Sequence, residues 1–188
     1  FTKDKAALKR TFSEFQLWDI LKNHTSLCYA IYLKTFSIIM VKEAVILAAG
    51  MGSRLGNQND QKPKGFLQLG NQPIIEESIK KLIKSGIEKI WIVTGYQSHY
   101  FKELTERYDS TVCLVSNEEY DQSGTLHSLS MIAEKVCPPF LLLESDIIFE
   151  YRAIEKILNH RNEDCLLLSG FNDCGDEVFV ETNHEELV

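Results

Sequence analysis

One stretch of the chain, from Ala44 to Phe66, constrains the fold more than any other, and it reads AVILAAGMGSRLGNQNDQKPKGF. Its first four residues are apolar and are typical of a strand buried on both faces of a parallel sheet. Small residues follow, and consecutive exposed N–H groups in such a loop form a concave site for anions. The stretch therefore predicts a buried strand that leads into an anion-binding loop. The loop residues are Ala48, Ala49, Gly50, Gly52 and Ser53.

Two cationic side chains accompany this loop. Arg54 offers a bidentate fork for phosphate oxygens, and Lys64, which follows Pro63, adds a point charge. A buried strand, a loop of small residues and two cations predict a site for a triphosphate. The alternative for each cation is an ordinary solvated charge in a polar loop.

Two other phosphate-binding patterns do not fit this stretch. A dinucleotide-binding turn needs a third glycine where this chain has Leu55, and Gly56 comes one residue late. That turn also needs a second strand ending in an acidic residue, and polar loop sequence follows instead. A Walker loop needs Gly-Lys-Ser or Gly-Lys-Thr, which this chain lacks.

Strand and helix patterns alternate from Met40 onward. The predicted strands lie near 44–47, 89–94, 111–115, 140–143, 164–169 and 176–181, and the predicted helices near 75–83, 98–108, 125–136 and 151–159. Apolar stripes are expected on the first helix at Ile75, Ile79, Leu82 and Ile83, and on the third at Leu126, Leu129, Ala133 and Val136. The alternation predicts an α/β fold with a mostly parallel sheet, helices on both faces and ligand at the carboxyl ends of the strands.

The motif LAAGMGSRLG, followed by PKG with its lysine ten residues after Arg54, resembles the nucleotidyltransferases that join a nucleoside triphosphate to a phosphorylated small molecule. Within that superfamily the chain is similar to bacterial cytidylyltransferases that act on phosphocholine or 2-aminoethylphosphonate. Further segments agree in order and approximate spacing, so the resemblance covers roughly residues 41 to 181. These segments are PKGFLQLGNQPIIEESI, GIEKIWIVTGY, SNEEYDQSGTLHSL, FLLLESDIIFE and GDEVFVE.

This resemblance implies a domain organisation. It implies a Rossmann-like three-layer sandwich with a mostly parallel, mixed sheet, of the nucleotide-diphospho-sugar transferase type. Residues 40–188 are then the catalytic domain, with its C-terminal part missing from this sequence. Residues 1–39 are either a helical N-terminal appendage or upstream sequence from outside the natural protein.

The resemblance also implies the reaction and its residues. CMP would pass from CTP to a small phosphate or phosphonate with release of pyrophosphate, and Mg²⁺ would neutralise charge on the phosphates. Catalytic roles fall on Arg54, Lys64 and Asp146, with Asp146 as the magnesium ligand; a turn cap is the alternative for Asp146. The nucleotide is expected against Leu47, Ala48, Ala49, Gly50, Gly52, Ser53, Arg54, Lys64, Gly95, Tyr96, Asn117, Ser123, Gly124 and Thr125.

A cationic group on the acceptor would need aromatic faces or carboxylates. Tyr120, Glu144 and Asp176 are the residues expected to bind it. The carboxylates favour a primary amine, as in 2-aminoethylphosphonate, over the quaternary ammonium of phosphocholine. The identity of the acceptor stays open at this stage.

Two other functions compete with the cytidylyltransferase hypothesis. A sugar-1-phosphate nucleotidyltransferase typically has Gly-Gly at the start of the loop and Thr before the arginine, where this chain has Ala48, Ala49 and Ser53. A nucleotide-binding regulatory module without catalysis is the second alternative. Retention of Arg54, Lys64 and Asp146 together argues against that loss of catalysis.

Charge and cysteine content narrow the partners and the compartment. The chain of 188 residues has a net charge of −7, and residues 1–39 contribute +3 of it, which leaves −10 on the remainder. A body this acidic argues against nucleic acid as a partner. The five cysteines contain no C-x-x-C pair and favour a reducing cytoplasm, and the apolar run before Met40 is too interrupted to span a membrane. A homo-oligomer is compatible with the sequence, which does not determine the oligomeric state.

Overall fold

The computed structural model describes residues 40–52, 62–160, 164–170 and 180–183, and the helices and strands below lie in one compact unit, Lys42–Val188. Strands β1 (Glu43–Ala48), β4 (Lys89–Thr94), β5 (Val112–Ser116) and β6 (Phe140–Glu144) form a parallel sheet in the order β5-β4-β1-β6. The order places β1, which precedes the small-residue loop, at the centre with β4 and β6 beside it. The predicted parallel sheet is confirmed.

The register of the sheet brings the carboxyl ends of its strands together. Leu47 lies opposite Val93 on β4 and opposite Glu144 on β6. Beyond the ladder, the Ser145 N–H donates to the Leu47 carbonyl at 3.0 Å, which continues the alignment of the two chains past β6. Residues just after β1, β4 and β6 therefore meet at one edge.

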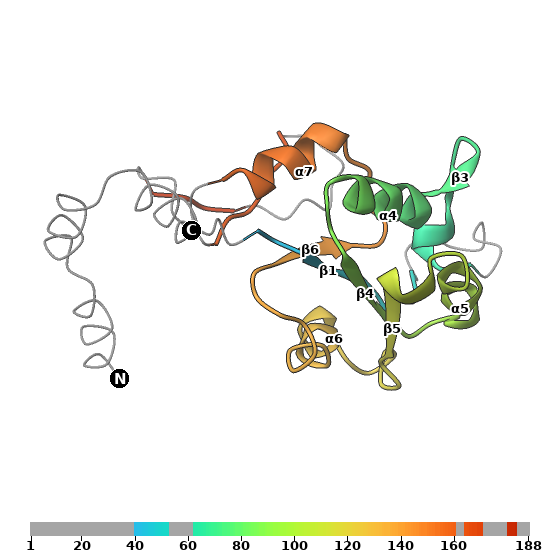
Figure 1. The fold of residues 1–188 in the computed structure, drawn as a ribbon. Helices are drawn as coiled ribbons and strands as arrows, with labels where there is room; N and C mark the ends of the chain where they lie inside the picture. Colours follow the sequence, from blue (N-terminus) through green and yellow to red (C-terminus); the bar gives the residue numbers. More distant parts are fainter. Residues whose placement is uncertain (1–39, 53–61, 161–163, 171–179, 184–188) are drawn as a thin grey trace, which may run out of the picture. The chain divides into compact units, whose positions relative to one another are not determined.

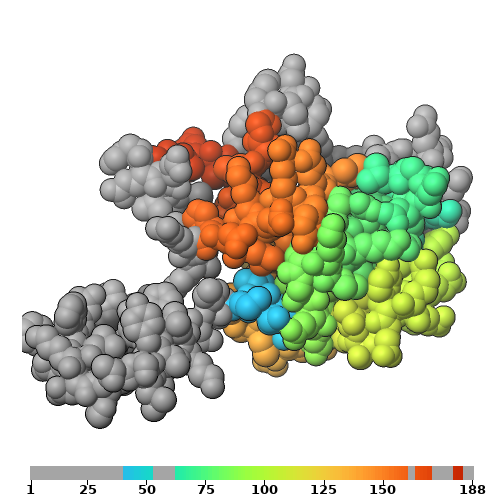
Figure 2. Space-filling view, turned by 45° about the horizontal axis from the view of Figure 1, so that its top comes forward, coloured from blue at the N-terminus to red at the C-terminus, as the bar shows by residue number. Residues whose placement is uncertain are grey.

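Helices cover both faces of this sheet, as predicted. The α-helices are α4 (Ile74–Lys84), α5 (His99–Thr105), α6 (Thr125–Ser130) and α7 (Tyr151–Leu158), and the 3-10 turns are η2 (Lys64–Phe66) and η3 (Asp109–Thr111). Figure 1 shows α4 and α7 on one side of the sheet and α6 on the other. In the space-filling view of Figure 2, the orange surface of α7 adjoins the green surface of α4.

The predicted stripe on α4 is correct except at its last member. Ile75, Ile79 and Leu82 are fully buried, whereas Ile83 is 39% exposed. Ser78 takes part in the buried face instead, and its hydroxyl donates to the Ile74 carbonyl at 3.2 Å. A polar residue is accepted there because its own helix satisfies the hydroxyl.

The stripe predicted for the third helix is wrong in half of its members. Leu126 is 79% exposed although it lies within α6. Ala133 is also exposed, and it lies beyond Ser130, where α6 ends and the chain continues as turns. Ile132 and Val136 are the residues that reach the core on this face. They pack with Val45, Leu47, Val93 and Val115.

A short hairpin around Gly70 is not among the strands predicted from the sequence. Strands β2 (Gln68–Leu69) and β3 (Gln72–Pro73) pair antiparallel across Gly70, whose φ of +64° suits glycine. Strands of two residues leave no periodic pattern in a sequence, which explains why they were missed.

The strand predicted at 164–169 is wrong, since residues 164–170 are not part of any strand in the described chain. Leu166, Leu167 and Leu168 are 67%, 48% and 54% exposed, and Cys165 therefore lies outside any core strand.

Of the strand predicted at 176–181, residues 176–179 lie outside the described residues, and Val180 and Glu181 are not in a strand. Residues 1–39 also lie outside the described chain. Within the part described, no helix has the length and apolar character needed to cross a membrane.

Candidate active site

A pocket of about 230 Å³ opens at the carboxyl edge of the sheet. One wall consists of the end of β1 and the loop after it, and a second consists of the end of β6. The segment 120–128 forms a third wall, and Lys64 reaches in from η2. The pocket is lined by Leu47, Ala48, Ala49, Gly50, Gly52, Lys64, Tyr120, Ser123, Gly124, Thr125, Ser128, Glu144, Ser145 and Asp146.

The structure thus brings most of the predicted site residues into one cavity. Ser128 and Ser145 line it as well and were not singled out from the sequence. Ser128 lies four residues after Gly124, so it shares a helix face with that residue, and this spacing could have revealed it. Ser145 lies between Glu144 and Asp146, two predicted site residues, and this position in the sequence could have indicated that it lines the pocket.

Arg54, Ser53 and Asp176 were predicted for the site and lie outside the described residues. Gly95, Tyr96 and Asn117 are described, but they do not line the pocket. Each of these three residues instead contacts residues that do line it.

The charged end of the pocket is formed by Lys64, Asp146 and Glu144. The Lys64 Nζ lies 3.3 Å from the Asp146 Oδ2, and the two side chains are 34% and 36% exposed. Removal of water around Glu144 raises the pKa of its carboxyl, the nearby Asp146 carboxylate raises it further, and the Lys64 ammonium partly opposes both effects. Two carboxylates and one ammonium therefore share a small, partly desolvated volume.

Gly65 couples the two chain segments that carry Lys64 and Asp146. A Cβ added to Gly65 would lie 2.9 Å from the Ser145 carbonyl oxygen and 3.2 Å from the Ser145 Cβ. Only glycine allows η2 to approach the end of β6 this closely. The backbone contact between Gly65 and Ser145 thereby fixes the spacing between the lysine and the carboxylate.

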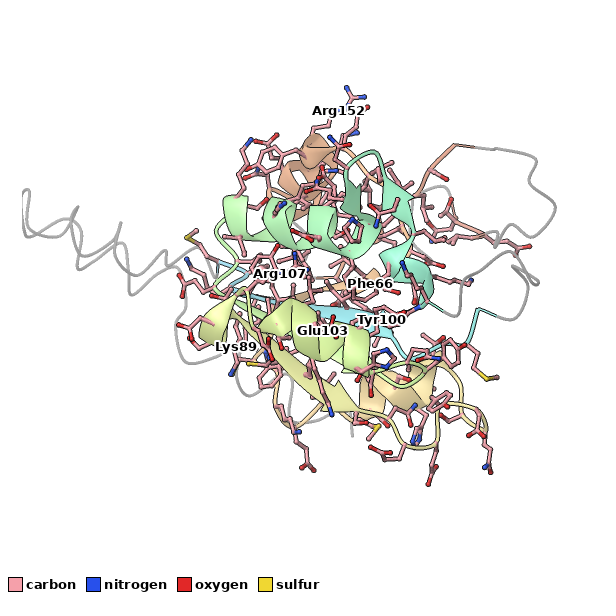
Figure 3. The ribbon with its side chains drawn as sticks, turned by 90° about the vertical axis from the view of Figure 1, so that its right-hand side faces the viewer. Phe66, Lys89, Tyr100, Glu103, Arg107 and Arg152 are labelled. Carbon is pink, nitrogen blue, oxygen red and sulfur yellow. The ribbon has the colours of Figure 1, made fainter. Side chains whose placement is uncertain are left out.

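Aromatic packing anchors the other end of η2. The Phe66 ring lies 5.0 Å from the Phe101 ring, edge to face, and 5.4 Å from the Tyr100 ring. Figure 3 shows Phe66 and Tyr100 near each other, close to the middle of the view. Because Phe101 is fully buried on α5, η2 is fixed to the body of the domain by this cluster.

The segment after Asp146 is attached to α4 by Lys81. The Lys81 Nζ donates to the Phe149 carbonyl, lies 5.1 Å from the Phe149 ring centroid and pairs with Glu77 at 3.2 Å. The Lys81 side chain is only 18% exposed. This side chain therefore restrains the chain three residues beyond Asp146.

Replacing Lys81 by methionine is expected to lower the free energy of unfolding by about 1–2 kcal/mol, because the Phe149 carbonyl loses a charged donor. Amide hydrogen exchange should rise in residues 147–150. Urea denaturation and exchange measured by mass spectrometry test both effects. Lys84→Met is the matched control, since Lys84 covers the Tyr151 ring at 4.5 Å but donates no described hydrogen bond to this segment. Equal exchange in the two variants would contradict the anchoring role.

Tyr120 lines the pocket and is supported by Gly95 and Tyr96. A Cβ on Gly95 would lie 2.4 Å from the Tyr120 Cβ and 2.9 Å from the Ala49 carbonyl oxygen. The Tyr96 ring lies 6.4 Å from the Tyr120 ring, and the Tyr96 N–H donates to the Ala49 carbonyl at 3.2 Å. Gly95 and Tyr96 thus position both Tyr120 and the loop after β1.

The donor set at Asp146 fits Mg²⁺. This ion binds oxygen ligands and often takes only one or two carboxylates, with phosphate and water oxygens completing its shell. Asp146 and Glu144 supply two carboxylates, and their mutual repulsion is what a divalent cation would relieve. Within the described ranges, no group of three or more His, Cys, Asp or Glu side chains could hold a metal ion. A metal here would therefore need phosphate or water oxygens in addition to the two carboxylates.

A small-residue loop at the carboxyl edge of a parallel sheet, with a lysine and two carboxylates facing it, defines a nucleotide-binding α/β domain. Residues 44–187 match the MobA-like NTP transferase domain, and the chain belongs to this family.

Several characterised proteins are similar to this chain. It is 33% identical over 108 residues to choline-phosphate cytidylyltransferase of Streptococcus pneumoniae, covering 57% of this chain and 46% of that protein. It is 34% identical over 116 residues to 2-aminoethylphosphonate cytidylyltransferase of Lancefieldella rimae, covering 58% and 47%. UTP–glucose-1-phosphate uridylyltransferase AglF of Haloferax volcanii is 29% identical over 124 residues, covering 64% and 50%.

Solved structures agree with the fold. The CTP:phosphocholine cytidylyltransferase LicC of Streptococcus pneumoniae superposes with a TM-score of 0.52 at 34% identity, over 57% of this chain and 46% of that one. The nucleotide-diphospho-sugar transferase type of α/β fold is therefore confirmed. The chain spans about half the length of these curated relatives.

Proposed function

We propose that this protein transfers CMP from CTP to a small phosphorylated or phosphonate compound and releases pyrophosphate. The observation that carries the proposal is that Lys64, Asp146 and Glu144 line one pocket together with the small-residue loop after β1. The residues from 40 to 188 would form the catalytic domain. The protein would act in the cytoplasm on small molecules, without a nucleic-acid or membrane partner.

The proposed transfer does not require a strong general base. A phosphonate or phosphate oxygen of the acceptor is already largely ionised near neutral pH, so it can attack the α-phosphorus of CTP without losing a proton to the enzyme. One P–O bond forms to the acceptor, and the bond between the α-phosphorus and the bridging oxygen breaks as pyrophosphate leaves. Alignment of the two reactants and neutralisation of charge are the remaining requirements.

The chain's own residues meet these requirements in distinct places. Lys64 can exchange its contact with Asp146 for a phosphate oxygen, since the lysine is one-third exposed to the pocket. Arg54, which lies outside the described residues, would add a second cation. Asp146, with Glu144 beside it, would hold Mg²⁺, which when bound withdraws charge from the phosphate oxygens.

The pocket also has the features that a pyrimidine and an amino-bearing acceptor require. Ala48, Ala49 and Gly50 line the pocket with small side chains, against which a base could pack. Tyr120 and Glu144 offer an aromatic face and a carboxylate to a cationic acceptor group, and Asp176 would add to them. The similarity to both phosphocholine and 2-aminoethylphosphonate cytidylyltransferases supports this acceptor class.

A sugar-1-phosphate nucleotidyltransferase is the second candidate, and the similarity to the uridylyltransferase AglF favours it. The two candidates differ in the nucleotide and the acceptor that they predict. They share the roles of Lys64 and Asp146.

Magnesium-dependent pyrophosphate release from the full-length protein tests the proposal. CTP, UTP, GTP and ATP would each be combined with 2-aminoethylphosphonate, phosphocholine or glucose 1-phosphate. We expect release with CTP and one of the two amino-bearing acceptors. Release only with glucose 1-phosphate would establish the second candidate, and nucleotide binding without release from any pair would indicate a regulatory module.

A further inference from the structure

Asn117 lies behind the pocket wall, and its side chain is 1% exposed. The Asn117 Nδ2 donates to the Ser123 Oγ and to the Ser128 Oγ, both at 3.0 Å. The Asn117 Oδ1 accepts from the Glu119 N–H at 3.0 Å, and the Asn117 N–H donates to the Thr94 carbonyl at 2.7 Å. This one residue therefore ties the end of β4 to two serines that line the pocket.

The orientation of the amide follows from its partners. A backbone N–H can only donate, so the group facing Glu119 must be the amide oxygen and the group facing the serines must be the NH₂. The NH₂ has two hydrogens, and each serves one serine oxygen. Both Oγ atoms are therefore fixed as acceptors on the side of Asn117.

Because each serine oxygen accepts a hydrogen bond from Asn117, the hydroxyl proton of each serine is available to donate to another group. Among the described residues, neither the Ser123 nor the Ser128 hydroxyl donates to a protein acceptor. Both serines line the pocket. Because Ser128 is only 4% exposed, a ligand in the pocket is the main acceptor available to its hydroxyl proton. A buried hydroxyl gains when a ligand supplies the missing acceptor.

We infer that Asn117 is a positioning residue that sets Ser123 and Ser128 as a pair of hydrogen-bond donors to the nucleoside. This inference rests on the proposed function, because it takes the ligand in the pocket to be a nucleotide. The matching chemistry is an uncharged acceptor oxygen, either the base carbonyl of cytosine or a ribose hydroxyl oxygen. Asn117 itself touches no ligand in this arrangement.

Replacing Asn117 by aspartate tests the donor polarity with almost no change in shape. One carboxylate oxygen can still accept from the Glu119 N–H, but the other can only accept, so both serine hydroxyls must turn their protons toward it. The two serine oxygens then present lone pairs to the pocket and no longer donate to a ligand. Because two donated hydrogen bonds of about 1 kcal/mol each are lost, we expect the Kd for CTP to rise about 30-fold in calorimetry.

Ser128→Ala and Ser123→Ala give a second test that introduces no buried charge. Each removes one donor and is expected to raise the Kd for CTP about 5-fold. Ser130→Ala is the matched control on the same helix, because the Ser130 hydroxyl is exposed and donates to the His127 carbonyl instead. Its Kd should equal that of the wild type.

Repeating the titrations with 2′-deoxy-CTP separates the two acceptors. If the penalty of the serine variants disappears with the deoxy nucleotide, the 2′-hydroxyl oxygen is the acceptor; if it persists, the acceptor is the base carbonyl or the 3′-hydroxyl oxygen. Unchanged CTP affinity in Ser123→Ala and Ser128→Ala, with normal binding by the wild type, would overturn the inference alone. Failure of the wild type to bind any nucleotide would instead refute the proposed function.

Discussion

If the proposed function is correct, replacing Asp146 by asparagine is expected to lower kcat for CMP transfer by about 100-fold or more. The Mg²⁺ that we propose for this site would lose a carboxylate ligand, and the triphosphate would lose the charge neutralisation that this ion would supply. The variant should also need far more Mg²⁺ to reach half of its own maximum. Initial rates of pyrophosphate release across a magnesium titration measure both effects.

The loss should not come from unfolding. Asp146 and Lys64 are each about one-third exposed, and an ion pair of that kind contributes at most about 1 kcal/mol to stability. Glu150→Gln is the matched control, since Glu150 follows Asp146 by four residues but pairs with Arg152 at the surface, 2.6 Å away. An Asp146→Asn variant with an unchanged magnesium requirement would move the metal site elsewhere.

The sheet could be predicted from the sequence because apolar runs mark its strands. The runs at β1 and β4 are mostly buried and favour strands covered on both faces, whereas β6 is apolar in sequence but leaves Leu142 48% exposed. The run at 164–169 has the same composition and is not a strand, because strand formation also requires a neighbouring ladder. Apolar composition alone does not supply that partner.

Two charged groups of the site were predictable for a related reason. The ends of parallel strands meet at one edge, so the position of Glu144 and Asp146 at the end of β6 predicted them beside the loop after β1. Lys64 follows no strand of this sheet, and only its motif, which resembles that of the family, indicated its place in the site. Contacts that support these groups were not predictable. The attachment of Lys81 to Phe149 joins residues 68 positions apart, and no local pattern marks it.

Asn117 illustrates the limit most clearly. Its position after β5 indicates a place near the site, and the sequence prediction made it a nucleotide contact. The structure places its amide behind the wall, with all three of its described side-chain hydrogen bonds made to protein. Whether a side chain at a strand end faces the ligand or the protein depends on packing that the sequence does not record.

Replacing Gly95 by alanine is expected to weaken both the fold and the binding of CTP. The added Cβ would lie 2.4 Å from the Tyr120 Cβ, 2.7 Å from the Tyr120 Cγ and 2.9 Å from the Ala49 carbonyl oxygen. None of these atoms is the flexible end of a side chain, so the backbone must move. Overpacking of this kind costs about 1–3 kcal/mol, measured as the loss in the free energy of unfolding in urea.

The same movement should reach the ligand, because Tyr120 and Ala49 both line the pocket. We expect the Kd for CTP to rise by at least about 10-fold in calorimetry. This rise corresponds to a loss of about 1.4 kcal/mol of binding free energy as Tyr120 and Ala49 move away from the binding geometry. Gly170→Ala is the control for the substitution itself, since a Cβ at Gly170 would meet open space.

A double-mutant cycle attributes the effect to Tyr120. Tyr120→Gly removes the two closest atoms, so adding it to Gly95→Ala should cost less stability than it does in the wild type, with a coupling of about 1 kcal/mol or more. Strictly additive losses would mean that the clash with the Ala49 carbonyl dominates. In that case Gly95 positions the loop after β1 rather than the tyrosine, and the loss of CTP affinity would persist in the double variant.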